Sequence, residues 1–234
     1  MLGSFYGIGV GPGPVDLLTV RAVELLKQVD VVCVPASGGT INAALTIANN
    51  YIAGKTVTEI SLPMTRDPEV LETHWQQGAQ QICALLRQGK DVAFITIGDA
   101  MLFSTYTYLM KKIMELEPTV TIESVPGITS FAASAAHVNI PLAESNERLL
   151  IIPALDDPTE LENIFQLASN VVLMKVAGRY DAIVAMLDKV NLLDKAVYIS
   201  KLGYPEQLVT RDLQSLVGKK IDYLSLILVK QGGL

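Results

Sequence analysis

Three short loops carry the residues with the clearest capacity for chemistry. Residues 7–14 have glycine at every second position and proline at positions 12 and 14, residues 96–102 contain Asp99, and residues 125–130 end in two hydroxyl side chains. Glycine allows a ligand to come very close to the backbone, and proline stiffens the loop. A carboxylate or a hydroxyl group can bind a ligand, although each can equally cap the helix that follows. Together, the loops predict a site for a small polar ligand.

The first loop looks like a dinucleotide-binding turn but lacks its spacing. A GxGxxG motif that starts at Gly7 needs glycine at position 12, and one that starts at Gly9 needs it at position 14, where Pro12 and Pro14 stand. No acidic residue ends the second predicted strand, and the chain has no GxxxxGKS or GxxxxGKT phosphate loop. The loop is therefore either a tight structural turn or one wall of a site for another ligand.

The composition argues against several classes of protein. The formal net charge is −6 and Lys and Arg form no dense run, so we do not expect nucleic-acid binding. Cys33 and Cys83 have no CxxC spacing, and His74 and His137 are isolated, so we expect two reduced thiols and no metal held by the protein. The apolar runs are far shorter than the ~20 residues of a membrane span. With no export signal visible, the expected location is the cytoplasm.

Short β-rich runs alternate with helical patterns in the first part of the chain. Strands are predicted at residues 5–10, 29–34, 55–62, 91–96 and 119–125. Helices are predicted after Asp16, which can cap the first of them, and at residues 42–51, 68–88, 102–114 and 129–137. Strands separated by such helices form a parallel sheet with right-handed crossovers. The three loops then lie at its carboxyl edge, where ligands bind in open α/β sheets.

The pattern changes at residues 139–148, where Pro141 and several polar residues predict a linker. Beyond it, only three helices accompany strands at residues 149–153, 170–176, 196–201, 206–211 and 223–230. Because Gly203-Tyr204-Pro205 joins two of these strands without a helix, we expect a hairpin there. The fold class is thus α/β with two domains: residues 1–140 with a mostly parallel sheet and flanking helices, and residues 141–234 with a mixed sheet. The active-site cleft is expected between them.

Several motifs together resemble the tetrapyrrole (corrin/porphyrin) methylases of corrin and sirohaem synthesis. They are residues 7–13, 98–106, 125–131 and 171–175, and the C-terminal strand. A second set is most similar to the precorrin-2 C20-methyltransferase branch of that family and comprises residues 61–67, Trp75 and residues 103–106. The resemblance implies a two-domain enzyme, usually a homodimer. It would use S-adenosylmethionine, released as S-adenosylhomocysteine, to methylate precorrin-2 or cobalt-factor II in cobalamin biosynthesis.

The resemblance also implies which residues bind the cofactor. In the first half these are Pro12, Ile97, Gly98, Asp99, Leu102, Thr129 and Ser130. In the second half, around the adenine, they are Met174, Leu202, Gly203, Tyr223, Leu224 and Ser225. Taken alone, a methionine at a strand end belongs more often to the core. Two positions depart from the family: Ala100 replaces its usual proline, which makes that loop less stiff, and Pro14 stands where aspartate is common.

The implied reaction needs little acid–base chemistry. A sulfonium methyl is an activated electrophile and a meso carbon of a reduced tetrapyrrole is an enamine-like nucleophile, so the enzyme has mainly to align them and exclude water. The candidates for a base that removes the C20 proton are Tyr106, Asp99 and an ordered water. The cationic side chains that either clamp substrate carboxylates or are merely solvated are Arg21, Arg66, Lys175, Lys201 and Arg211.

Three alternatives stay open at this stage. The first is another regiospecific tetrapyrrole methylase, of the uroporphyrinogen-III or precorrin-4 type, which the position of the transferred methyl group distinguishes. The second is a protein methylase of the diphthine synthase type, which titration with elongation factor tests. The third is a non-catalytic regulator that binds a nucleotide-like ligand without any methyl turnover.

Overall fold

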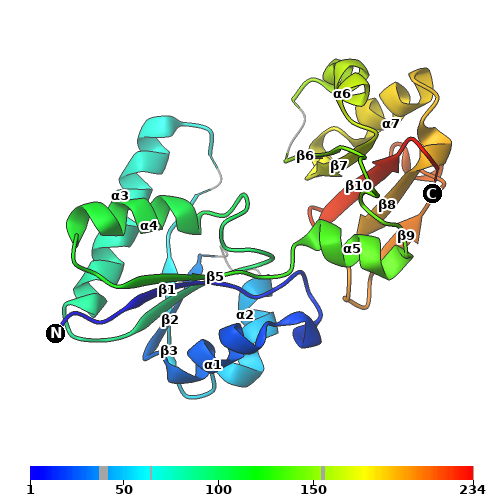
Figure 1. Cartoon of the computed structure of the whole chain (residues 1–234). Helices are drawn as coiled ribbons and strands as arrows, with labels where there is room; N and C mark the ends of the chain where they lie inside the picture. Colours follow the sequence, from blue (N-terminus) through cyan, green and yellow to red (C-terminus); the bar gives the residue numbers. More distant parts are fainter. Residues whose placement is uncertain (37–41, 64, 154–155, 234) are drawn as a thin grey trace. The chain divides into compact units, whose positions relative to one another are not determined.

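The computed structural model describes residues 1–36, 42–63, 65–153 and 156–233, with its elements labelled in Figure 1. The chain divides into two compact units, Met1–Thr129 and Ser130–Leu234, and each has its own five-stranded sheet. Met64, part of the motif at residues 61–67, lies outside the described residues. Within the described ranges, no helix has both the length and the apolar character to cross a membrane.

The strands of the N-terminal unit form one parallel sheet, as predicted. They are β1 (Phe5–Gly9), β2 (Val31–Pro35), β3 (Thr56–Ile60), β4 (Val92–Thr96) and β5 (Ile122–Val125). Their order is β3-β2-β4-β1-β5. The apolar runs of β2 and β4 are buried because helices cover both faces of the sheet. In this order β1 lies between β4 and β5, so the strands that precede the three candidate loops are direct neighbours.

Helices cover the two faces of this sheet in pairs (Figure 1). They are α1 (Val20–Gln28) and α2 (Ala43–Ala48) on one face, and α3 (Pro68–Leu86) and α4 (Tyr106–Leu116) on the other. Because successive strand residues point to opposite faces, Ile8 packs with α1 and α2, whereas Phe5 packs with α3 and α4. Two short 3₁₀ turns, η1 (Val15–Leu17) and η2 (Asn49–Tyr51), complete the unit.

Two predicted helix starts are wrong. Asp16 lies in η1, and the helix that follows is capped by Thr19, whose Oγ1 accepts the Ala22 N–H at 3.2 Å. The fourth helix begins at Tyr106 rather than at residue 102. Phe103 has φ +51°, which a right-handed helix cannot accommodate.

The C-terminal unit has the predicted mixed sheet and hairpin. Its strands are β6 (Leu149–Ile152), β7 (Asn170–Met174), β8 (Ala196–Ser200), β9 (Leu208–Thr210) and β10 (Ser225–Lys230). The order is β6-β7-β10-β8-β9, with β6 and β7 parallel and the other pairs antiparallel. The helices are α5 (Ser130–Val138), α6 (Leu161–Leu167) and α7 (Tyr180–Lys189). The 3₁₀ turns are η3 (Pro158–Glu160), η4 (Val176–Gly178), η5 (Leu193–Lys195) and η6 (Gln214–Leu216).

Helix α5 belongs to the C-terminal unit, although the sequence assigned it to the first domain. It packs on β10, and the His137 ring in its last turn contacts Gln207. The compact units therefore divide after Thr129 rather than after residue 140.

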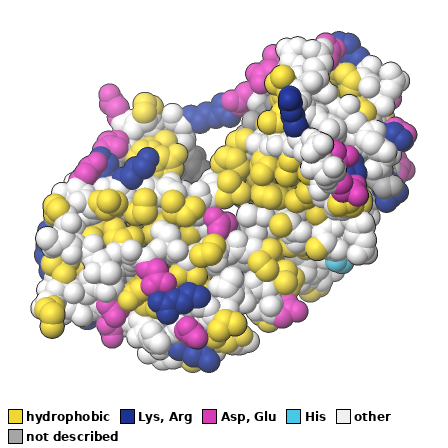
Figure 2. Space-filling view, viewed as in Figure 1, with side chains coloured by type: hydrophobic (Ala, Val, Ile, Leu, Met, Phe, Trp, Pro, Cys, Tyr) yellow, Lys and Arg dark blue, Asp and Glu magenta, His cyan; other side chains and the backbone are white. Residues whose placement is uncertain are grey.

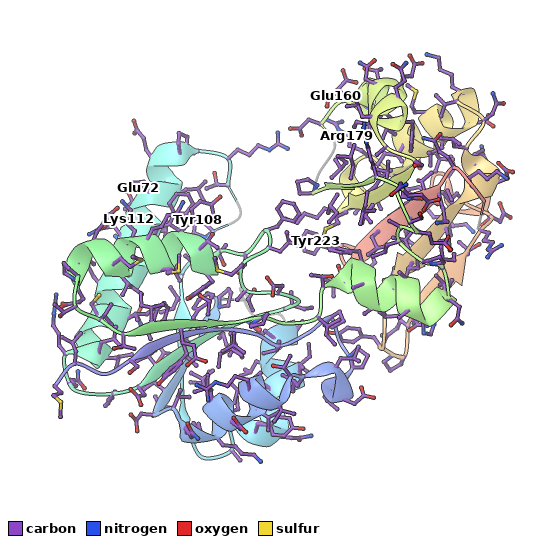
Figure 3. The ribbon with its side chains drawn as sticks, viewed as in Figure 1. Glu72, Tyr108, Lys112, Glu160, Arg179 and Tyr223 are labelled. Atoms are coloured by element: carbon purple, nitrogen blue, oxygen red, sulfur yellow. The ribbon has the colours of Figure 1, made fainter. Side chains whose placement is uncertain are left out.

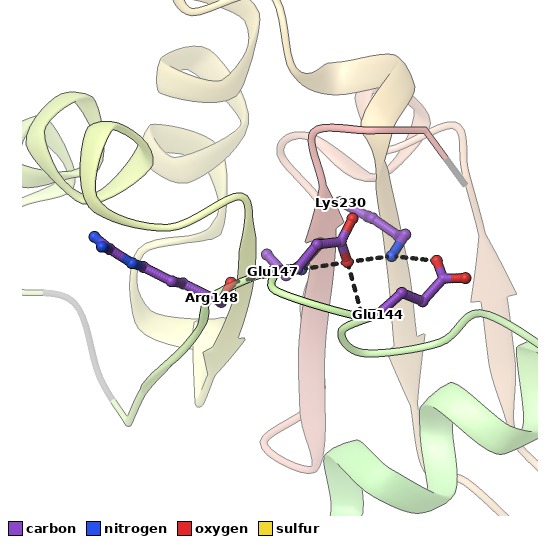
Figure 4. Close-up of polar contacts among 5 residues, drawn as sticks. Glu144, Glu147, Arg148 and Lys230 are labelled. Atoms are coloured by element: carbon purple, nitrogen blue, oxygen red, sulfur yellow. Dashed lines mark hydrogen bonds and ion pairs between the residues drawn. The ribbon is translucent and has the colours of Figure 1, made fainter.

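The predicted linker is fastened to the sheet of the C-terminal unit by a buried lysine (Figure 4). Lys230 Nζ lies 2.9 Å from Glu147 Oε2 and 2.9 Å from Glu144 Oε2. Glu147 also accepts a hydrogen bond from Asn170 Nδ2 at 3.0 Å. The Lys230 ammonium, with help from Asn170, lowers the pKa of Glu147 to about 2. The linker residues after α5 are thus held by charge as well as by packing.

Candidate functional site

The loops after β1 and β4 are joined at the carboxyl edge of the N-terminal sheet. Gly11 and Gly98 exchange two backbone hydrogen bonds, Gly98 N–H to Gly11 O at 2.7 Å and Gly11 N–H to Gly98 O at 3.1 Å. Both glycines have positive φ, +79° and +72°, which explains why glycine is needed at these positions. The glycine-rich start of the chain is therefore paired with the second candidate loop.

The third loop comes into backbone contact with the other two. A Cβ at Gly127 would lie 2.0 Å from the Gly98 carbonyl oxygen, and a Cβ at Gly9 would lie 2.6 Å from the same atom. No side chain larger than hydrogen fits at these distances. Loops that are remote in sequence thus meet through glycine backbones, as their adjacent strands require.

Asp99 ties the second loop to the third. Its Oδ2 accepts the Gly127 N–H at 2.9 Å, and its Oδ1 accepts the Met101 N–H at 2.8 Å. Asp99 does not cap α4: that helix starts later, and Ser104 Oγ accepts the Tyr106 N–H at 3.2 Å. The carboxylate is half-buried, and each of its oxygens already has a backbone donor.

The edge formed by these loops is open beside Gly98. The position of a Cβ on Gly98 has no other heavy atom within 4 Å, so a ligand can approach this backbone directly. Ile97 and Leu102 flank it and are half-buried, whereas Pro12 is buried. Ala100, the departure from the family pattern, is fully buried in the core cluster beneath α3 and α4. Its side chain therefore serves packing.

Hydrophobic side chains reach solvent close to this opening. Met101 is 53% exposed and Phe103 is 47% exposed. Figure 2 shows hydrophobic patches on the face that it draws, with Lys and Arg scattered among Asp and Glu. Met101 and Phe103 therefore make apolar surface available beside the loop cluster.

Tyr106, one of the predicted candidate bases, lies in the core. The side chain is fully buried between Phe5 and Phe94, and its ring occupies the space above Gly7, where a Cβ would lie 2.0 Å from Cζ. Its hydroxyl is 2.8 Å from Ser124 Oγ. Burial raises the pKa of this phenol. We therefore interpret Tyr106 as a structural residue that explains the glycine at position 7.

The motif residue Trp75 also has a structural contact. Its ring stacks on Tyr108 with centroids 4.1 Å apart, which joins α3 to α4. Lys112 Nζ lies 2.6 Å from Glu72 Oε1 along the same pair of helices (Figure 3). Thr129 and Ser130 are half-buried where the N-terminal unit ends and α5 begins.

The predicted adenine contacts of the C-terminal unit gather at one edge of its sheet. In register, Met174 at the end of β7 pairs with Leu226, and Ser200 at the end of β8 pairs with Ser225. The remaining predicted residues flank these strand ends and are Leu202, Gly203, Tyr223 and Leu224. Met174 and Leu224 are half-buried, and Tyr223, 55% exposed, projects from the start of β10 (Figure 3).

Sequence reasoning missed two unusual backbone positions at this edge. Lys175 follows β7 with φ +55°, and Lys201 follows β8 with φ +48°. Left-handed conformations of residues other than glycine concentrate at functional sites. Lys201 Nζ lies 3.2 Å from Asp222 Oδ2, and Lys175 is exposed. Another candidate clamp, Arg21, forms two 2.7 Å hydrogen bonds to Glu123, so it is already engaged.

The fold and the joined loops define an α/β protein whose three candidate loops meet at the carboxyl edge of a parallel sheet, the edge at which open α/β sheets bind ligands. Residues 4–216 match the family model of the Tetrapyrrole (Corrin/Porphyrin) Methylases. The chain belongs to this family and is a methyltransferase. Among the part of the chain that the structure describes, no group of three or more His, Cys, Asp or Glu side chains is arranged to hold a metal ion.

Two curated relatives agree with this assignment. The chain is 37% identical to a cobalt-precorrin-2 C(20)-methyltransferase from Salmonella typhimurium, over 99% of this chain and 98% of the relative. It is 35% identical to a probable cobalt-precorrin-2 C(20)-methyltransferase from Methanocaldococcus jannaschii, over 97% of this chain and 95% of the relative.

Two solved structures share the fold over almost the whole chain. A cobalt precorrin-4 methyltransferase has a TM-score of 0.75 at 21% identity, covering 97% of this chain and 94% of its own. A uroporphyrin-III C-methyltransferase from Thermus thermophilus, complexed with S-adenosylhomocysteine, has a TM-score of 0.68 at 19% identity, covering 98% of this chain and 99% of its own. At this level of identity the likeness concerns the fold.

Proposed function

We propose that this enzyme transfers the methyl group of S-adenosylmethionine to the C20 meso carbon of precorrin-2 in cobalamin biosynthesis. The observation that carries the proposal is the full-length likeness, at 37% and 35% identity, to relatives named as cobalt-precorrin-2 C(20)-methyltransferases. Both names specify a cobalt-containing substrate, which favours cobalt-loaded over metal-free precorrin-2 here. Cobalt then belongs to the substrate.

The open edge beside Gly98 fits a ligand with a polar end, which supports S-adenosylmethionine as the methyl donor. In this proposal the backbone of Gly98 and the Asp99 carboxylate receive the amino acid end, with Ile97 and Leu102 as apolar borders and Thr129 and Ser130 from the third loop. Pro12 is buried, so its contribution is to hold the first loop in place. Met174, Leu202, Gly203 and the start of β10 receive the adenine.

The residues of this chain then have to align and shield the reactants. When bound, the cofactor supplies an activated sulfonium methyl group. The loops joined at Gly11, Gly98 and Gly127 hold its position without a conformational cost at each turnover, because their backbones are already locked together. Exposed Met101 and Phe103 offer apolar contact to a macrocycle and exclude water from it.

Two groups remain in this proposal for removing the C20 proton after transfer. Asp99 retains free lone pairs on both oxygens, and an ordered water beside it would have the same access. Lys175, exposed at the edge of the C-terminal sheet, is a reasonable partner for a substrate carboxylate.

Methyl transfer from labelled S-adenosylmethionine tests the function directly. Purified enzyme is incubated with metal-free precorrin-2, cobalt-precorrin-2, uroporphyrinogen III and a precorrin-4 substrate, and the labelled carbon is located by NMR. We expect label at C20 and faster turnover of the cobalt-loaded substrate. Label at another carbon, or turnover of only another tetrapyrrole, would contradict the proposal.

We further propose that the enzyme is a cytoplasmic homodimer, as the family resemblance implies. Cys33 and Cys83 are both free and buried, which suits a reducing compartment. Light scattering coupled to size-exclusion chromatography measures the mass in solution, and cell fractionation measures the location. A monomer at micromolar concentration would contradict the first statement, and enzyme recovered outside the cytoplasmic fraction would contradict the second.

A further inference from the structure

Gln207 links the last turn of α5 to the turn that follows β8. Its Oε1 accepts the backbone N–H of Gly203 at 2.8 Å. Its Nε2 lies 2.7 Å from Nε2 of His137. Gly203 has φ +80° and stands directly after Leu202, at the sheet edge that the proposed function assigns to the adenine. One side chain therefore connects a helix to the backbone of a proposed cofactor-binding turn.

These two contacts determine the orientation of the amide and the protonation state of the imidazole. A backbone N–H only donates, so the amide oxygen must face Gly203. The amide nitrogen of Gln207 also only donates, so Nε2 of His137 must accept. A neutral ring that carries its proton on Nδ1 accepts there, whereas a doubly protonated ring has no acceptor. The contacts are mutually compatible only while His137 is neutral.

We infer that Gln207, oriented by neutral His137, is a positioning residue that holds the Gly203 turn for the adenine of S-adenosylmethionine. The inference rests on the proposed function, in which this turn contacts the cofactor. When His137 takes up a second proton, two donors face each other and the Gln207 amide must rotate away or turn over. Either movement removes the acceptor from the Gly203 N–H. The affinity for the cofactor therefore falls when the His137 ring on α5 becomes positively charged.

The charged groups around this set of contacts are paired with one another or exposed to solvent. Lys201, in the turn after β8, pairs with Asp222, which precedes β10. Glu144 and Glu147, which follow α5, both bind Lys230 of β10. Glu206 is exposed beside Gln207, and β9 and the rest of α5 contribute no charged side chain. Carboxylates and amines as classes keep their charge between about pH 5 and 8, where histidine changes its own.

Calorimetric titration with S-adenosylhomocysteine between pH 5.5 and 8 tests the coupling. Wild type is expected to bind about fivefold more weakly at pH 5.5, the usual effect of losing one hydrogen bond. In Gln207→Glu the carboxylate accepts from both Gly203 and a charged His137, so the loss at low pH disappears. His137→Asn keeps an acceptor that does not titrate, so its affinity is independent of pH. Gln214→Glu adds the same charge at an exposed position of the same unit and should behave as wild type.

NMR provides a readout that a merely structural role would not change. The chain has two histidines, so His137 is followed directly and His74, on α3, serves as the internal control. By linkage, saturating S-adenosylhomocysteine lowers the midpoint of the His137 titration by about 0.7 pH, the logarithm of the fivefold change, and leaves the His74 midpoint in place. In Gln207→Glu the His137 midpoint moves upward even without ligand.

The outcomes separate this inference from the proposed function. Normal binding of S-adenosylhomocysteine with an unmoved His137 midpoint would overturn the role of Gln207 and leave the methyltransferase proposal standing. If the affinity of Gln207→Glu for S-adenosylhomocysteine depended on pH as that of wild type does, the role of Gln207 would likewise be overturned and the methyltransferase proposal would stand. No binding of S-adenosylhomocysteine to wild type at any pH would overturn both.

Discussion

The carboxylate of Asp99 accepts the backbone N–H of Gly127 at 2.9 Å, across 28 positions of sequence, and so ties the loop after β4 to the loop after β5. The opposite oxygen holds Met101 in its own loop. A residue that looks like a helix cap in the sequence is therefore the polar link between two walls of the candidate site. The arrangement explains why a carboxylate is needed there: two donors on different loops require two acceptor atoms on one rigid group.

We expect Asp99→Ala to lower the free energy of unfolding by about 2 kcal/mol and to weaken the binding of S-adenosylhomocysteine, because the half-buried Gly127 N–H and the more exposed Met101 N–H both lose their partner. Asp99→Asn retains one acceptor oxygen and should recover part of both effects. Urea denaturation measures the first effect, and calorimetry measures the second. Wild-type ligand affinity in Asp99→Ala would show that the tie between the loops is not needed for the site.

Two glycines of the site differ in what an added methyl group meets, so they form a matched pair. At Gly98 the Cβ position is open, and Gly98→Ala has only the left-handed φ to accommodate, at a cost of about 1–2 kcal/mol. At Gly127 the Cβ would lie 2.0 Å from the Gly98 carbonyl oxygen, so Gly127→Ala must move backbone. We expect a loss of at least about 3 kcal/mol there, measured by chemical denaturation.

Ligand binding extends this comparison. Gly98→Ala places a methyl group in the space proposed for the cofactor, so it should weaken S-adenosylhomocysteine far more than it weakens the fold. Gly127→Ala should impair both together. Equal stability of the two variants would contradict the close contact between the loops, and unchanged affinity in Gly98→Ala would contradict the assignment of the open edge to the cofactor.

Tyr106→Phe distinguishes a structural tyrosine from a catalytic base. The variant keeps the ring that fills the space over Gly7 and loses the hydroxyl contact with Ser124, so we expect about 1 kcal/mol lower stability. Turnover should stay within about twofold of wild type, whereas removal of a general base typically costs about 10²–10⁴ in rate. Steady-state kinetics on cobalt-precorrin-2 measures the turnover of both proteins. A rate loss of about 10²–10⁴ in Tyr106→Phe would show that Tyr106 is a catalytic residue.

The strands and their grouping could be read from the sequence because the signals are local. Apolar runs such as residues 31–35 end at proline or glycine. Two predicted strands flank Gly203 with no helical pattern between them, which predicts a hairpin without any knowledge of long-range contacts. Helix starts were harder, because Asp16 and Thr19 are both good caps and the choice depends on the path of the preceding loop. Phe103 gave no sign of its positive φ, so the start of α4 was placed too early.

Contacts between distant residues lay beyond sequence reasoning. Gly7 and Tyr106 fit together only after β1 and α4 pack. From the sequence alone, a tyrosine with a buried hydroxyl cannot be distinguished from one with a reactive hydroxyl. The assignment of α5 failed for a similar reason: its apolar, alanine-rich face fits either unit, and its contact with β10 and Gln207 decides the matter. The left-handed Lys175 and Lys201 are invisible as well, because lysine rarely adopts that conformation.

Glu147 should make the stability of the protein depend on pH in acid. Its pKa in the folded protein is about 2, well below the ordinary value of a glutamate, chiefly because Lys230 donates a hydrogen bond to it. A carboxylate with a depressed folded-state pKa adds stability that is fully present above its unfolded-state pKa and is lost as the pH falls toward the folded-state value. The loss from this group therefore lies between about pH 5 and pH 2.

Glu147→Gln removes the titrating group while keeping an oxygen that can accept from Lys230 or Asn170. We expect the free energy of unfolding of wild type, measured in urea at intervals from pH 6 to pH 2.5, to fall more steeply with acid than that of the variant. Glu144→Gln is the matched control: Glu144 contacts the same ammonium, but its side chain is 61% exposed against 29% for Glu147, so its removal should change the slope less. Parallel curves for wild type and Glu147→Gln would show that the ion pair with Lys230 does not hold residues 139–148 to the sheet in solution.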